Sequence, residues 1–251
     1  MKIVTFNIRC DYNQDGINSF EFRKALIEEK IKKEQPDIIS FQEVLPHVAV
    51  WLKEILDGYY VIGIGRSETY EDEQATIAYK KDVLNLMSFN TFWLSPTPTI
   101  PASRYEGQSI CPRTCACATF QILSSNRMFR VYNTHLDHES SNARLLGINQ
   151  IIKQIEDDNY AIKLPIILLG DFNGEPDSEE IFMLNQKSEI KDLTTEISYS
   201  FHDFGAVEEK IDYIYASKDI KCNHTEVWSD CLNQVYLSDH YPICAEVEIL
   251  K

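Results

Sequence analysis

The sequence predicts a layered α/β fold in a single domain over residues 1–251. Helical and strand-like hydrophobic patterns alternate along the chain, and no Gly/Ser-rich linker, low-complexity tract or long charge run divides it. A length of 251 residues suits one large domain. A weak internal repeat is also visible: strand, helix, strand and acid run from Asn7 to Glu43 and again from His135 to Asp171, over equal intervals. Two such halves would bring their strand ends together at one edge of the fold, where a polar cleft forms.

The N-terminal part reads as strand, helix, strand, helix. Residues 2–8 form the first strand, and a helix begins directly after Asn18, which can cap it with Glu21 at the spacing of a capping box. The apolar run 38–41 is the second strand. Pro46 stands where the first turn of a second helix would begin.

The middle and the end of the chain are rich in strands. A proline-containing loop over residues 95–108 separates two of them, and a helix with apolar residues in phase runs from Leu145 to Ile155. Asp177 can cap one more helix through Glu180. The remaining strand candidates are residues 59–64, 75–79, 83–93, 115–123, 129–135, 165–169, 210–216, 226–228 and 241–249.

The charge of the chain bears on its partners. Lys and Arg number 24 against 39 Asp and Glu, which gives a formal net charge of −15. Nucleic-acid binding relies on basic surfaces that neutralise phosphates, and the sequence has no basic stripe for tracking a strand. Small phosphodiesters, nucleotides and sugar or inositol phosphates are therefore favoured over polymeric RNA or DNA. We infer no protein partner.

The sequence also bears on location and redox state. No apolar run approaches the ~18 residues that span a bilayer, and the chain opens without a secretory signal, so we expect a cytoplasmic protein without membrane contact. Seven cysteines, an odd number, indicate reduced thiols. Cys111, Cys115 and Cys117 form a cluster that could bind zinc, but the alternation around them favours packing within a strand.

Polar side chains follow or precede apolar strands in five places. A carboxylate at the end of a buried strand is unfavourable unless it is hydrogen-bonded, paired or metal-bound. Five such ends carrying amides, acids and histidines indicate one common cleft. They are Asn7, Gln42-Glu43, Asn133–Asp137, Gly170–Asn173 and Ser238–Pro242.

These motifs carry a resemblance to a known family. In chain order they read TFN, QEV, THL, GDFN, IDYI and SDHYP, between Thr5 and Pro242. The sequence thereby resembles the endonuclease/exonuclease/phosphatase superfamily, and most of all its branch of carbon-catabolite-repressor deadenylases, nocturnin and small bacterial relatives. Residues 92–98 and 111–114 are similar to that branch.

The resemblance implies a fold, an activity and a metal. The fold is a four-layered α/β sandwich, with two packed mixed β-sheets flanked by helices. The activity is divalent-metal-dependent phosphoester hydrolysis. Glu43 would hold Mg²⁺ or Mn²⁺, Asn7 would support that site, and Asp239 would be a further ligand.

The resemblance also implies catalytic roles. Asp171 and Asn173, two apart on an extended segment, would position the attacking water and the phosphate. His240 would act as general base, directly or through a water, with Asp212 orienting its ring. His135 would donate to a non-bridging phosphate oxygen.

Other residues are candidates on their chemistry. Arg113 would bind a substrate phosphate or, equally, pair with a carboxylate of the cleft. His202 and His138 are candidates for substrate binding. Arg144 is expected on the surface of its helix.

Three hypotheses for function follow. The first is a metal-dependent phosphoesterase acting on a small phosphorylated substrate, with a 3′–5′ RNA exonuclease of the deadenylase kind as its alternative. The second is a non-catalytic binding module, which would not need both His240 and its orienting acid Asp212. The third is a zinc or thiol enzyme built on the Cys111–Cys117 cluster.

Overall fold

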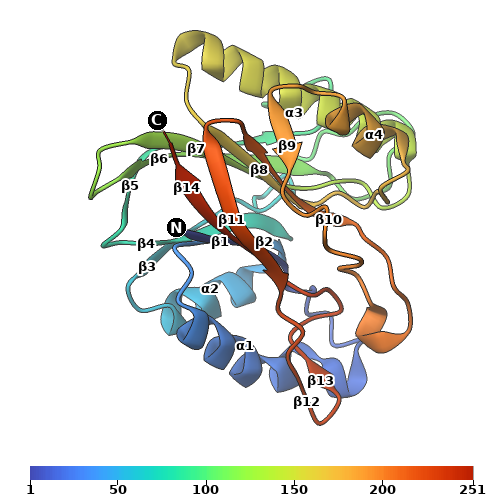
Figure 1. Cartoon of the computed structure of the whole chain (residues 1–251). Helices are drawn as coiled ribbons and strands as arrows, with labels where there is room; N and C mark the ends of the chain where they lie inside the picture. The colour runs from blue at the N-terminus through green and yellow to red at the C-terminus, as the bar shows by residue number, and fades with distance from the viewer. Residues whose placement is uncertain (251) are drawn as a thin grey trace.

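The computed structural model describes residues 1–250 and shows a four-layered α/β sandwich (Figure 1). Two mixed six-stranded sheets pack face to face. Helices α1 (Phe20–Glu34) and α2 (Pro46–Ile55) cover the outer face of the first sheet. Helices α3 (Ser141–Ala161) and α4 (Glu179–Asn185) cover the second. The fold class predicted from the motifs is confirmed.

The two sheets each combine parallel and antiparallel strands. The first sheet, in spatial order, contains β11 (Ile220–Val227), β14 (Ile243–Ile249), β1 (Lys2–Asn7), β2 (Ile38–Val44), β4 (Gln74–Lys80) and β3 (Tyr59–Ile62). The second contains β5 (Leu84–Trp93), β6 (Thr114–Ile122), β7 (Met128–His135), β8 (Ile166–Asp171), β10 (Asp212–Ser217) and β9 (Ile190–Asp192). A small hairpin, β12 (Cys231–Leu232) and β13 (Val235–Tyr236), lies beside α1 (Figure 1). None of the helices within residues 1–250 has the length and apolarity needed to cross a membrane.

The central strands are buried on both faces, which creates the layers. Along β1, Ile3 packs between the sheets, whereas its neighbour Val4 packs beneath α1 and α2. Along β8, Ile167 faces the first sheet and Leu168 faces α3. Alternate residues of a strand point to opposite faces, so one near-continuous apolar run serves two cores.

The internal repeat corresponds to two parallel strand pairs. Strand β1 runs parallel to β2 with Asn7 opposite Gln42, and β7 runs parallel to β8 with His135 opposite Asp171. The polar ends of all four strands therefore lie at the same edge of the sandwich, as the repeat predicts.

Two helix starts differ from the sequence prediction. Helix α1 has Ser19 at its N-cap, and the Asn18 side chain instead accepts a hydrogen bond from the backbone N of Tyr236, at 3.0 Å. Helix α4 begins after Ser178, so the prediction that Asp177 caps it is wrong. The capping prediction for Asn18 is wrong because a tertiary contact with β13 takes its side-chain oxygen.

Gly170 generates a stability prediction. Its φ of +144° is in a region that favours glycine, and a Cβ there would lie 1.9 Å from the carbonyl oxygen of Thr134. We expect Gly170→Ala to lower the free energy of unfolding by at least ~4 kcal/mol, in the exceptional range for single substitutions. Gly58→Ala is the control, because Gly58 also has a positive φ, of +86°, but a Cβ there would meet nothing within 4 Å. It should cost only ~1–2 kcal/mol. Equal losses in urea unfolding would contradict the steric argument.

Candidate active site

The polar strand ends converge on one edge of the sandwich. Asn7 and Glu43 come from the first sheet, and His135 and Asp171 come from the second. Strand β10 is antiparallel to β8, so its first residue, Asp212, lies opposite Asp171. The loop before β14 supplies the last predicted group, at residues 238–240.

Glu43 reaches this edge through an irregularity in its strand. The pairing of β2 with β4 shifts register between Phe41 and Val44, and Glu43 has a φ of +62°. Bulges of this kind re-aim a side chain. The Glu43 carboxylate accepts hydrogen bonds from the Asn7 amide, at 2.9 Å, and from the backbone N of Cys10, at 2.8 Å. Burial opposes ionisation of Glu43, but these hydrogen bonds and the charge of His240 together outweigh it and lower the pKa of Glu43.

The side-chain amide of Asn7 links carboxylates of the two sheets. Its Nδ2 donates to Glu43 Oε1 and to Asp171 Oδ2, both at 2.9 Å. Burial and the nearby charge of Asp212 raise the pKa of Asp171 to about 7. The ligand atoms of Glu43, His135 and Asp171 lie within 4.8 Å of one another. This donor set of carboxylates and an imidazole fits a divalent cation, whose charge would stabilise the buried acids.

His240 forms an ion pair with a buried acid. Its Nδ1 donates to Asp212 Oδ2 at 2.7 Å, and its Nε2 lies 3.8 Å from Asp171 Oδ2. Burial disfavours the imidazolium, but the charges of Asp212, Asp239 and Asp171 outweigh it and raise the pKa of His240 to about 10. In the metal-free protein the ring is therefore positively charged at neutral pH.

His135 and Asn173 complete the group on the second sheet. His135 Nε2 lies 3.5 Å from Asp171 Oδ2. Burial, followed by the charges of Arg113 and Arg66, lowers the pKa of His135 well below its usual range, so its ring is neutral. The sequence suggested that Asn173 lies on an extended segment, but the chain turns at this residue. Its φ is +48°, and its backbone N donates back to Asp171 Oδ1 at 2.9 Å.

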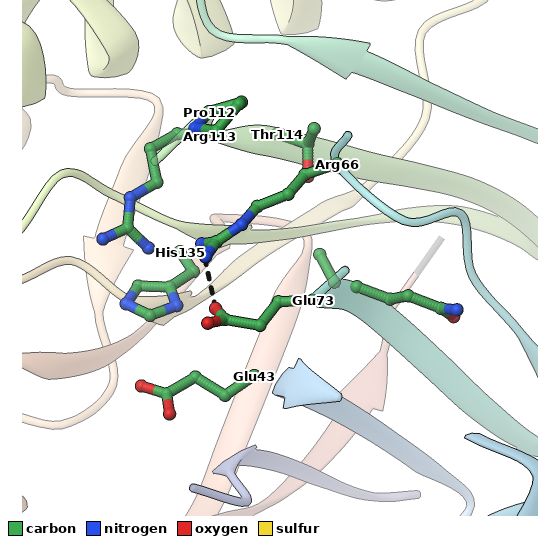
Figure 2. Close-up of a pocket in the computed structure, with 9 residues that line it drawn as sticks. Glu43, Arg66, Glu73, Pro112, Arg113, Thr114 and His135 are labelled. Atoms are coloured by element: carbon green, nitrogen blue, oxygen red, sulfur yellow. Dashed lines mark ion pairs between the residues drawn. The ribbon is translucent and has the colours of Figure 1, made fainter. Parts of the chain in front are cut away.

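A cavity of about 350 Å³ lies at this edge. Among the predicted residues, eight line it: Glu43, Arg113, His135, His138, Asp171, Asn173, Asp239 and His240. Asn7 and Asp212 contact this group through hydrogen bonds. Figure 2 shows the guanidinium groups of Arg66 and Arg113 near His135, with the Glu73 carboxylate paired to Arg66 and the Glu43 carboxylate below this group. The cavity therefore presents both signs of charge around one space.

Comparison with known proteins places the chain in a family. The sequence matches the endonuclease/exonuclease/phosphatase family over residues 4–240. The chain belongs to this family. It is a phosphoester hydrolase by membership, and the family generally depends on divalent metal ions.

Individual members of the family are similar over different lengths. A Bacteroides vulgatus endonuclease/exonuclease/phosphatase structure superposes with a TM-score of 0.92 at 30% identity, covering 99% of this chain and 98% of that one. A Bacteroides thetaiotaomicron mannosyl-6-phosphatase has a TM-score of 0.91 at 24% identity, covering 99% of each chain. Nocturnin of Drosophila melanogaster is 30% identical over 175 residues, which are 63% of this chain and 25% of that protein.

Some candidate residues lie elsewhere than the sequence suggested. His202 is 1% exposed and stacks on Tyr241, with ring centroids 3.9 Å apart, and it does not line the cavity. Arg144 is not a free surface residue: it pairs with the buried Glu180 and donates to the carbonyl oxygen of Asp137. Cys115 packs in the core beneath α3, as the strand interpretation predicts.

Sequence reasoning missed several residues of the cavity wall. The charged ones are Arg9, Arg66, Glu73 and Glu209, and Cys10 and Phe201 also line the cavity. Arg9 is two residues after Asn7, just beyond the TFN motif, and this proximity is a signal that could have found it. Arg66 and Glu73 pair at 2.9 Å across the β3–β4 connection, and local sequence carries no sign of their position.

The burial of His202 predicts a pH dependence of stability. Burial and the charge of His240 lower the pKa of His202 to about 4. In the unfolded chain this histidine binds its proton near pH 6.5. The contribution of His202 to the free energy of unfolding is therefore fully present above that pH and is lost as pH falls toward 4. His202→Phe, which keeps the stack on Tyr241, should make stability fall less between pH 6.5 and 4. Urea midpoints across this range measure it, and the exposed His224→Phe is the control. Identical pH profiles for wild type and His202→Phe would contradict the prediction.

Proposed function

We propose that the protein is a divalent-metal-dependent phosphoesterase that hydrolyses a small phosphorylated substrate at this cavity. One observation carries the proposal: carboxylates, three histidines and a buried arginine with unused donors face a single space of about 350 Å³. That volume suits a small molecule. The mannosyl-6-phosphatase, whose whole chain superposes on this one, acts on a compact phosphorylated sugar by its name.

Arg113 is the residue that fits a phosphate. It is 4% exposed, its Nη2 contacts His138 Nδ1 at 2.8 Å, and its Nε and Nη1 have no hydrogen-bond partner within residues 1–250. Asp137 lies 3.9 Å from Nε, too far for a hydrogen bond. A buried guanidinium with unused donors is unfavourable, and a substrate phosphate accepting from them would relieve this. Of the two roles that the sequence allowed for Arg113, phosphate binding is the one we propose.

Glu43 would hold the cation, and the ligand atoms of Asp171 and His135 lie close enough to contact the same ion. Asn7 would orient the two carboxylates through its amide. A bound Mg²⁺ or Mn²⁺ supplies a Lewis acid that polarises a phosphoryl oxygen. The neutral His135 would donate a hydrogen bond to a non-bridging oxygen without adding a charge that repels the cation.

Proton transfer would belong to the Asp171–His240 pair. These groups are 3.8 Å apart and both line the cavity, so a water that contacts both would lose its proton to the pair as it attacks phosphorus. The bond from phosphorus to the ester oxygen of the substrate would break in the same step, and that oxygen would leave with a proton from solvent. Asp212 fixes the ring by accepting from Nδ1, which directs Nε2 to the cavity. The side-chain Nδ2 of Asn173 donates to the carbonyl oxygen of Leu136 at 3.0 Å. This hydrogen bond would hold the loop after β8 in place beside the substrate.

Coupling between His240 and Asp212 gives a test of this assignment. His240→Gln should reduce kcat roughly 10²–10⁴-fold, the usual contribution of acid–base catalysis. Asp212→Asn should also reduce it, and the double variant should be no slower than His240→Gln alone by more than a few-fold, since the residues act as a unit. The exposed Asp157→Asn is the control. If the fold-reductions in kcat of the two single variants multiply in the double variant, the two residues act independently.

A second candidate function is supported by the similarity to Drosophila nocturnin and by the deadenylase-like motifs. It is 3′–5′ exonuclease action on RNA. The net charge of −15 and the acids at the cavity wall, such as Glu209, disfavour a long polyanion. We therefore rank it below a small substrate.

A substrate panel separates the two functions. With Mg²⁺ or Mn²⁺, and not with EDTA, we expect hydrolysis of sugar phosphates or nucleotides. On any oligonucleotide that is accepted, kcat/KM should be nearly independent of length beyond a few residues and should change little with salt. For a strand-tracking enzyme, the logarithm of the binding constant falls with the logarithm of the salt concentration, with a slope of about −0.7 for each phosphate that it contacts on a single strand. An efficiency that climbs steadily with poly(A) length, with a steep salt slope, would favour the exonuclease.

A further inference from the structure

The Arg9 guanidinium occupies the space between carboxylates at the edge of the proposed cation site. Its Nη1 lies 3.1 Å from Asp239 Oδ2, and its Nε and Nη2 each donate to one oxygen of Asp15 at 3.1 Å. Glu43 is a further negative charge that acts on it. Arg9 lines the same cavity as Glu43 and Asp239.

The backbone holds Arg9 in this place. Its φ is +63°, and its backbone N donates to Asn7 Oδ1 at 3.0 Å, so the chain turns back at the end of β1. The fully buried Arg23 donates to the carbonyl oxygens of Ile8, at 2.7 Å, and Leu237, at 2.9 Å. Arg23 thereby ties the Arg9 turn to the segment that carries Asp239.

Asp239 is fully engaged without a metal ion. It is 2% exposed; its Oδ1 accepts from the Ser238 hydroxyl at 3.0 Å, and its Oδ2 pairs with Arg9. The two groups of side chains that could hold a metal ion within residues 1–250 contain Glu43, His135, Asp171, Asp212 and His240, but not Asp239. The resemblance had suggested Asp239 as a metal ligand, and the ion pair with Arg9 points to a different role.

We propose that Arg9 acts as a built-in cation that replaces a second metal ion, so that the active site binds one divalent ion only. An arginine side chain keeps its charge at every physiological pH, and its three nitrogens contact Asp239 once and Asp15 twice. A divalent ion beside Asp239 would have to displace a guanidinium that makes three contacts with carboxylate oxygens of Asp239 and Asp15. Arg9 is thus a positioning residue that sets the metal count. The inference rests on the cation site of the proposed function.

Counting bound metal tests this inference directly. Titration of the full chain with Mn²⁺, followed by calorimetry and by the electron paramagnetic resonance of free Mn²⁺, should give one ion per wild-type chain. Arg9→Met removes the charge and should give two ions. Arg9→Met/Asp239→Asn should return the count to one, and Arg9→Lys should keep it at one. The exposed Lys153→Met is a matched control for loss of a surface charge and should also bind one.

A second readout covers the chance that Arg9→Met folds poorly. Arg9→Gln removes the charge but keeps a hydrogen-bonding side chain, and it should also bind two ions. In either neutral variant the increase in melting temperature produced by Mn²⁺ should exceed that of wild type, because the uncompensated carboxylates gain a second ion. A merely structural role would lower the melting temperature without changing the metal count.

The failures are distinguishable. Two ions in wild type, or one ion in folded Arg9→Met and Arg9→Gln, would overturn the role of Arg9 and leave the proposed phosphoesterase in place. No bound Mn²⁺ in any variant would overturn the proposed metal-dependent function and this inference with it.

Discussion

The amide group of Asn7 holds together carboxylates that come from different sheets. Its two hydrogen bonds, to Glu43 of the first sheet and Asp171 of the second, cross the plane between the layers at their polar edge. Two buried acids would otherwise repel each other and lose hydration. Much of the edge depends on this link: the backbone N of Arg9 donates to the side-chain oxygen of Asn7, and His240 Nε2 lies 3.8 Å from Asp171 Oδ2.

The remaining charges of the cavity are arranged around that link. On one side, His240 and Arg9 offset Asp212, Asp171 and Asp239 through direct pairs. On the other side, Arg66 is neutralised by Glu73, while Arg113 keeps unused donors. The positive charge that is free to meet an anion is therefore localised at Arg113. This arrangement suits one phosphate in a bounded space better than a continuous polyanion.

Parallel strand pairs explain why one edge could be assembled from distant segments. The carboxyl ends of β1 and β2, and of β7 and β8, lie at the same side because each pair is joined by a helix that returns the chain to its starting edge. Tight turns, such as the one where Asn173 folds back on Asp171, then fix the polar side chains.

The sequence by itself indicated a layered α/β fold and the edge at which chemistry is possible, and its motifs, through their resemblance to the family, implied the four layers. Polar residues at strand ends of equal spacing are expected to meet where parallel strands end. Most residues of the candidate site belong to those strand ends. Local pattern did not place Asn18 at a contact with β13, or His202 beneath Tyr241. It also could not reveal that Arg9 pairs with Asp239, 230 positions along the chain. The tertiary structure decides such partners, because hydrophobic periodicity reports which face of a strand is buried and not which side chains from distant segments meet. Which charged groups neutralise one another depends on how loops from both sheets pack around the same cavity.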